Sequence, residues 1–283
     1  MTPMHPLERT MRASALAFTA LLLTAGSSAA QSAAEIIDQM LDEYEARTEG
    51  IDNYTLVQDF MGFSATSYFV KELVDGRPVF KLQAVSAAGM DMQDSGPGTL
   101  DEIYAMGEDF KDNATYLGRE TVDGRDTHVL EIADLGDTEL GQQMGQDSEF
   151  RPTSGRLFLD AEEYMPRRMI FEGELENDEG VHAVTSTMDL LDYREHEGLL
   201  VAHRTVMTIE GLGAAIDEDA RAQFEQMERE LEDMPPEQRR MVESMMADQL
   251  EQFRAMMAGD DESMVVEVAV SDVRVNAGPP GGR

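Results

Sequence analysis

The chain has 283 residues, no cysteine and a formal net charge of −35 at pH 7. This length suits one domain with an insertion, or two small domains. The strong negative charge excludes a surface that attracts nucleic acid or anionic lipid headgroups. The lack of cysteine excludes disulfides and the lipid-attachment cysteine of a lipoprotein. The acidity fits a protein of a salty habitat, or one that is simply kept soluble by its charge.

Residues 1–30 predict a secretory signal peptide. Two arginines precede the apolar run ASALAFTALLLTAG, and the sequence SAA at 28–30 offers small residues for cleavage near Ala30. The run is too short for a good membrane span. We therefore expect an exported chain that starts near Gln31, is soluble in the periplasm or secreted, and forms a single domain over 31–283.

Residues 32–51 predict an amphipathic helix. Ser32 can cap its start together with Glu35, as a capping box, and Gly50 can end it. The apolar side chains recur at helical spacing and form one stripe: Ile36, Ile37, Met40, Leu41 and Tyr44.

From Tyr54 onward the apolar residues alternate with polar ones, which predicts antiparallel strands. The first set is YTLVQDF, ATSYFVKELV, RPVFKLQAV, ATYLGRETV and RDTHVLEIA. Residues 96–113 predict a loop and a short helix. The polar, Gly-rich residues 133–155 predict a surface loop with at most one helical turn. The second set is GRLFLD, PRRMIFEGELE, VHAVTSTMDLLDYRE, LLVAHRTVMTIEG and SMVVEVAVSDVRVN.

The tetrapeptide VDGR occurs twice, at 74–77 and 122–125. An Asp-Gly pair between alternating runs is the strongest short signal for a β-hairpin. The two flanking stretches share little else, so we interpret VDGR as one turn used twice and not as a repeat.

The first turn pairs Val74 with Arg77 and sets the register of its hairpin. One face of this hairpin then collects Phe69, Leu73, Phe80 and Leu82.

The second turn pairs Val122 with Arg125. The same register carries on to Leu117 opposite Leu130 and Thr115 opposite Ile132. Both faces of this hairpin are partly apolar, which indicates that both are covered.

Residues 217–259 predict a helical hairpin inserted at about 214–260, before the last strand. Pro235 and Pro236 separate its two amphipathic helices. Its flexible methionines could form a lid or a partner-docking face, or could merely pack the hairpin on the sheet. The lid or partner candidates are Met241, Met245, Met246 and Phe253.

Together these elements predict a mainly β (α+β) fold. A curled antiparallel sheet would form an unclosed β-barrel with an N-terminal helix and an inserted helical hairpin, since a large open sheet tends to curl.

Four segments carry a resemblance to a known family. They are AAEIIDQMLDEYEARTEGIDNYT after the leader, TYLGRETVDGRDTHVLEI with Gly118, Glu120 and Gly124, GRLFLDAEEYMPRRMIFEG with Asp160, Pro166 and Arg167, and YREHEGLLVAHRTVM, where a strand pair resumes after a Gly. In combination they resemble the bacterial outer-membrane lipoprotein carrier and receptor superfamily (LolA/LolB-like, with the outer membrane lipoprotein-sorting protein group). The resemblance covers roughly 33–210 and 263–276. The helical hairpin and the absence of Trp depart from it.

The resemblance implies an unclosed barrel with an apolar cavity. It implies a soluble exported carrier or binding protein for a lipid or lipoprotein acyl chain, linked to outer-membrane lipoprotein sorting. The alternative is a non-catalytic sensing or protein-interaction module that docks a partner through 217–259. Strand residues that could line the cavity, or could be ordinary core, are Phe69, Phe80, Leu130, Phe158, Met169 and Phe171.

No catalytic constellation accompanies these elements. The histidines at 128, 182, 196 and 203 lack metal-ligand spacing, and the sequence holds no Gly-x-Ser-x-Gly, P-loop or dinucleotide fingerprint. We therefore expect no enzymatic activity, no metal and no cofactor.

Overall fold

The structure is a computed structural model that describes residues 31–60, 63–74, 76–87, 90–92, 103–104, 107–138, 141–142, 150–177, 180–215, 218–240 and 263–280. The expected signal peptide and most of the second helix of the inserted hairpin lie outside these residues.

The first helix, α1, spans Ala33–Arg47 and confirms the predicted capping box. The backbone N–H of Glu35 donates to Ser32 Oγ at 3.2 Å, and the Ser32 N–H donates to Glu35 Oε2 at 2.9 Å. The predicted apolar stripe is buried along the whole helix. The helix ends three residues before Gly50, which adopts a positive φ of 79° in the following turn.

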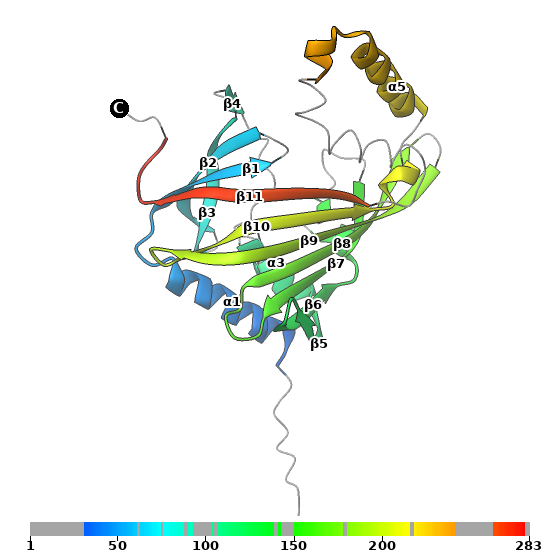
Figure 1. Ribbon diagram of the computed structural model, residues 1–283. Coiled ribbons are helices and arrows are strands. Elements are labelled where there is room, and N and C mark those ends of the chain that lie inside the picture. Colours follow the sequence, from blue (N-terminus) through cyan, green and yellow to red (C-terminus); the bar gives the residue numbers. More distant parts are fainter. Residues whose placement is uncertain are drawn as a thin grey trace, which may run out of the picture. The chain divides into compact units, whose positions relative to one another are not determined.

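One antiparallel sheet of 11 strands forms the body of the protein, in the order β4-β3-β2-β1-β11-β10-β9-β8-β7-β6-β5 (Figure 1). In the described residues no pairing joins the end strands β4 and β5, so the sheet is not closed. This confirms the mainly β fold with an unclosed barrel. The strands are β1 Asn53–Phe60, β2 Phe63–Val74, β3 Arg77–Ala87, β4 Met90–Met92, β5 Thr115–Val122, β6 Arg125–Ile132, β7 Phe150–Asp160, β8 Pro166–Asn177, β9 Gly180–His196, β10 Leu199–Glu210 and β11 Met264–Val275.

The first VDGR hairpin joins β2 and β3 in the predicted register. Val74 pairs with Arg77 and Phe69 with Leu82. Phe69 and Phe80 are buried as expected, but Leu73 is 74% exposed. Leu73 lies beside the turn, where the hairpin extends beyond the apolar cluster, so the prediction that it faces inward is wrong.

The second VDGR hairpin joins β5 and β6, and its register is as predicted only near the turn. A β-bulge between Tyr116 and Gly118 shifts the pairing, so Leu130 faces Tyr116 and Thr115 faces Glu131. Gly118 has a φ of 121°, a conformation that glycine adopts without strain. The bulge leaves Leu117 exposed, which corrects its expected place beside Leu130.

The segment 133–155, expected as a surface loop, contains part of the core. A 3₁₀ turn, η1, spans Leu135–Asp137, and the Leu135 side chain is fully buried. Strand β7 already begins at Phe150, five residues before the predicted start at Gly155. Local polarity misled the prediction, because a single buried leucine anchors an otherwise polar segment.

Two further helices and a 3₁₀ turn complete the elements named here. The predicted helix within 96–113 is α3, Gly107–Asn113, and a 3₁₀ turn, η2, spans Leu212–Ala215. The first helix of the inserted hairpin is α5, Glu218–Asp233, where Phe224 and Leu231 are buried. Residues 236–240 begin the next helix. None of the helices described here is long and apolar enough to cross a membrane.

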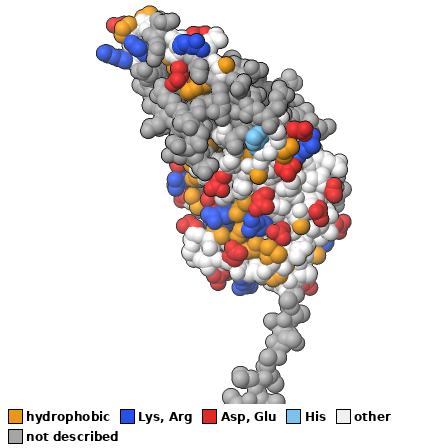
Figure 2. All heavy atoms as spheres, turned by 90° about the vertical axis from the view of Figure 1, so that its right-hand side faces the viewer, with side chains coloured by type: hydrophobic (Ala, Val, Ile, Leu, Met, Phe, Trp, Pro, Cys, Tyr) orange, Lys and Arg blue, Asp and Glu red, His pale blue; other side chains and the backbone are white. Residues whose placement is uncertain are grey.

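The described surface mixes both signs of charge. Figure 2 shows acidic and basic side chains interspersed with hydrophobic ones on the face it presents. Cross-strand ion pairs such as Arg168–Asp189 at 2.6 Å and Arg204–Glu267 at 2.9 Å account for part of this pattern. Most of the basic side chains that the structure describes are paired with carboxylates in this way.

A candidate apolar ligand site

Two apolar clusters lie where α1 packs against the sheet, and α3 contributes to the first of them. Figure 1 shows α1 and α3 together beside the strands. The first cluster joins α1 and α3 to strands β6 to β10, and the second joins the end of α1 to β1, β2, β3, β10 and β11. Tyr104 packs against both clusters, and its ring stacks on that of Tyr44 with centroids 3.8 Å apart.

Three cationic side chains hold α1 in place from three different elements. Lys111 of α3 reaches Asp38 at 2.6 Å, and Arg77 of β3 reaches Asp42 at 2.9 Å. Lys71 of β2 donates to the Thr48 carbonyl at the end of the helix, at 2.5 Å. Because α1 also buries its whole apolar stripe, at about 1.5–3 kcal/mol for each large side chain, it is a fixed part of the core.

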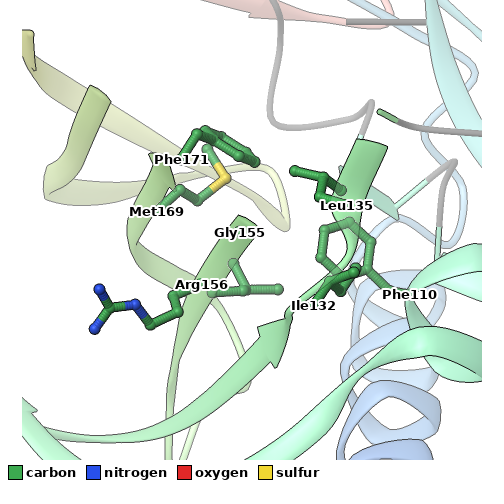
Figure 3. Close-up of a pocket in the computed structure, with 8 residues that line it drawn as sticks. Phe110, Ile132, Leu135, Gly155, Arg156, Met169 and Phe171 are labelled. Carbon is green, nitrogen blue, oxygen red and sulfur yellow. The ribbon is translucent and has the colours of Figure 1, made fainter. Parts of the chain in front are cut away.

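A small apolar pocket opens between α3, η1 and strands β6 to β8. Its free volume is about 10 Å³, roughly the space of one water molecule. Figure 3 shows Phe110, Ile132 and Leu135 on one side and Met169 and Phe171 on the other. The Arg156 guanidinium points away from the pocket (Figure 3), toward Glu172, to which it donates at 3.0 Å. The side chains that face the space are therefore apolar.

Gly155 sets the depth of this pocket. A Cβ at this position would lie 3.2 Å from Leu135 Cδ2 and 3.3 Å from Phe171 Cδ1. Both distances are shorter than an ordinary carbon–carbon contact. Any side chain at 155 would thus press on two of the pocket's walls.

The six predicted cavity residues fall into three places. Leu130 and Met169 are in the first cluster with Phe171 against it, and Phe69 and Phe80 are in the second. Phe158 packs with Val122, Val129 and Ile170 in a third cluster on the opposite face, because side chains alternate along β7. The structure therefore places Phe158 on the other side of the sheet, away from the predicted cavity. The hairpin candidates Met241, Met245, Met246 and Phe253 lie outside the described residues.

Sequence reasoning missed the two side chains that close the pocket, Phe110 and Leu135. Phe110 stands in the polar context GEDFKDN, and Leu135 in ADLGD. A lone large apolar residue in a polar segment was the available signal in both cases. Such a residue has few ways to avoid water other than docking on the neighbouring sheet.

Asp160, from a segment that carries the family resemblance, is the last residue of β7 and stabilises the turn that follows. Its side chain is 2% exposed and accepts hydrogen bonds from the backbones of Glu162 and Glu163, both at 3.0 Å. It also accepts from Arg125 at 2.9 Å and Arg167 at 3.1 Å. Burial works to raise the pKa of Asp160, but these donors and the nearby arginine charge outweigh it and lower the pKa.

His128 is a buried polar group in the first cluster's neighbourhood. Its Nδ1 lies 3.1 Å from the Tyr116 hydroxyl, and its ring stacks on Tyr164. Its Nε2 has no hydrogen-bond partner among the described atoms. Burial, followed by the charge of Arg119, lowers the pKa of His128, so the ring is held neutral.

A scan against protein-family models and a search of curated proteins found no match. Solved structures of similar fold include a domain described as an outer membrane lipoprotein-sorting protein from Vibrio parahaemolyticus, at 14% identity and a TM-score of 0.40, over 88% of this chain and 94% of that one. A DUF1329 family protein from Desulfovibrio piger matches at 10% identity and a TM-score of 0.40, over 87% and 93%. A LolA superfamily protein from Nitrosomonas europaea matches at 11% identity and a TM-score of 0.33, over 88% and 96%. Two of these structures come from the group that the sequence resembles, and the likeness is one of fold alone.

Proposed function

We propose that this chain is an exported, non-catalytic binding protein that holds an apolar chain between α3, η1 and the sheet. The ligand class is the acyl chain of a lipid or of a lipoprotein, and the compartment is the periplasm. The observation that carries the proposal is the pocket lined by Phe110, Leu135, Met169 and Phe171, in which apolar side chains face one another around free space. An apolar pocket at the edge of a large cluster is the usual form of a small-molecule site.

The pocket must widen before it can take an acyl chain, because its present volume is about 10 Å³. Phe110 is the residue that can make room, since it sits on α3, a helix of only 7 residues. In contrast, α1 is anchored by its buried stripe and its ion pairs. Each methylene that enters gains about 0.8 kcal/mol, so a few methylenes offset the displacement of one ring.

The first test asks whether the protein carries a lipid. We expect native mass spectrometry to show a bound species that organic extraction removes, and cis-parinaric acid to bind the stripped protein with saturable fluorescence. Protein that is repeatedly free of lipid and takes up no cis-parinaric acid would contradict the proposed function.

The second test locates the site with a matched pair of variants. Phe110→Ala removes a ring from the pocket, whereas Phe158→Ala removes an equally buried ring from the opposite face. If two more methylenes fit in the space left by Phe110, affinity for the probe rises about tenfold. Phe158→Ala should lower stability and leave affinity unchanged. Equal effects of the two variants on affinity would place the ligand elsewhere.

A further inference from the structure

Gly155 stands inside a strand whose conformation does not require a glycine. It pairs regularly with Ile132 of β6 and Phe171 of β8, and the bulge of β7 lies earlier, between Pro152 and Ser154. Its φ lies outside the left-handed region that favours glycine. A glycine in the interior of a strand weakens the strand and often marks a close approach of another group. The reason for glycine at 155 is therefore the space above the strand.

That space is the closed end of the apolar pocket. Figure 3 shows Gly155 between Leu135 on one side and Phe171 on the other. Ile132, Leu135 and Leu157 surround this end and are 2%, 0% and 1% exposed. A Cβ at 155 would come so close to Leu135 and Phe171 that both would have to give way by a few tenths of an ångström. One added carbon therefore shortens the pocket from within.

The pocket opens in the opposite direction, toward β9. Ser186 of β9 pairs with Phe171, and Met188 pairs with Met169, so their side chains continue the apolar face of the pocket across the sheet. Phe171, Ser186 and Met188 are half-buried, in contrast to the fully buried side chains at β6 and β7. A chain that enters from β9 would thus reach Gly155 last.

The chemistry of the closed end selects which end of a ligand goes in first. Arg156 is the charged side chain among the described residues that line the pocket, and its guanidinium points away to Glu172. An ionised headgroup that is buried without a partner costs far more than the apolar burial gains. The methyl end of an acyl chain therefore enters first, and the headgroup stays on the side of β9.

We propose that Gly155 sets the length of the acyl chain that this protein binds, because the methyl end stops against it. The inference rests on the proposed function, since it specifies which acyl chains the same site takes. Each methylene that reaches the closed end raises affinity about fourfold. Methylenes beyond this length stay outside the pocket and add no affinity there. The chain length at which affinity stops rising is called the length limit.

Displacement of cis-parinaric acid by straight-chain fatty acids that differ by one carbon measures the length limit. In the wild type, affinity should rise about fourfold per methylene up to the limit and then level off. Gly155→Ala adds one carbon at the closed end, so its limit should be one carbon shorter, with wild-type affinities for shorter acids. Gly155→Val adds three carbons and should shorten the limit further.

Two further substitutions separate a change of pocket length from a general effect on the strand. Ser154→Thr adds one carbon on the other face of β7, where the hydroxyl donates to Glu172, and should leave the limit unchanged. Leu135→Val removes one carbon above Gly155 and should lengthen the limit by one carbon. Gly155→Ala combined with Leu135→Val should restore the wild-type limit. If Gly155→Ala alone does not fold, comparison of this double variant with Leu135→Val gives the same test.

Nuclear Overhauser effects test the direction of entry. A bound fatty acid with a ¹³C-labelled terminal methyl group should show contacts to the Hα protons of Gly155. Contacts from the labelled methylene next to the carboxylate in its place would overturn the inference.

The outcomes distinguish this inference from the proposed function. A wild type that binds none of the fatty acids overturns both. A wild type that binds them, together with a Gly155→Ala limit that does not move or an equal loss of affinity at every length, overturns the role of Gly155 alone.

Discussion

Arg77 and Arg125 hold the same position in the two VDGR turns, and each binds a carboxylate outside its own hairpin. Arg77 lies 2.9 Å from Asp42 of α1, and Arg125 lies 2.9 Å from Asp160 at the end of β7. The two carboxylates differ in burial, because the Asp42 side chain is 70% exposed and that of Asp160 is 2% exposed. The same turn thus supplies one exposed and one buried link between elements.

Replacing each arginine by glutamine should show that the two ion pairs contribute differently to the free energy of unfolding. Arg77→Gln removes an exposed ion pair, so the free energy of unfolding should fall by less than about 1 kcal/mol, and by less still in concentrated salt. Arg125→Gln takes a charged donor from a buried carboxylate and should cost about 1–3 kcal/mol. Urea unfolding at low and high salt measures both. Equal losses with equal salt dependence would show that the burial of Asp160 does not matter.

Asp160→Asn should cost about 3 kcal/mol near neutral pH, because it leaves Arg125 and Arg167 facing an amide in place of a buried carboxylate. The pKa of Asp160 is lowered from 3.8, so its stabilisation is present above that pH and is lost as the pH falls below it. The difference between variant and wild type should therefore shrink in strong acid. Asp126→Asn, at an exposed position next to Arg125 in β6, is the control. Urea unfolding of wild type and both variants at each pH measures the difference.

His128→Leu should stabilise the protein in mild acid. The pKa of His128 is lowered from 6.5, so the unfolded chain takes up the proton more readily and stability falls as the pH drops through that value. Leucine removes both this titration and the unpaired Nε2, whose burial costs about 1–3 kcal/mol. Thermal unfolding from mild acid to mild base measures the change. A variant with the wild-type slope of stability against pH would contradict the buried, neutral state of His128.

Leu135→Ala should cost about 2–5 kcal/mol, as for other fully buried leucines. Leu117→Ala is the matched control, since Leu117 is 52% exposed. It should change stability by no more than about 0.5 kcal/mol. Losses of similar size in the two variants would mean that η1 does not anchor the segment between β6 and β7.

The sequence predicts the elements of this fold well where local chemistry decides them. Ser32 and Glu35 make the capping box that their spacing predicts, and Asp-Gly in VDGR sets the first residue pairs of both hairpins. These features depend on residues a few positions apart, so a pattern along the chain contains the necessary information.

Features that depend on residues far apart in the chain could not be predicted from local patterns. The bulge at Gly118 moves Leu117 to the surface, and the docking of Leu135 on the sheet depends on the space left by Gly155. The two faces of β7 are both apolar, so alternation alone could not tell that Phe158 faces away from Met169. The site residues that sequence reasoning missed, Phe110 and Leu135, belong to this class.

The order of the strands also determines how the chain could be rearranged. From β5 through β11, and then from β1 to β4, each strand lies beside the next across the sheet. This order passes between the two ends of the chain at β11 and β1, where Asn276 Oδ1 accepts from the Asp52 N–H at 2.7 Å and Asn276 Nδ2 donates to the Gly50 carbonyl at 3.0 Å. In a circular permutant that begins at β5 and ends at β4, every pair of adjacent strands would therefore be consecutive along the chain, and the pairing of β11 with β1 would span only α1 and its flanking residues.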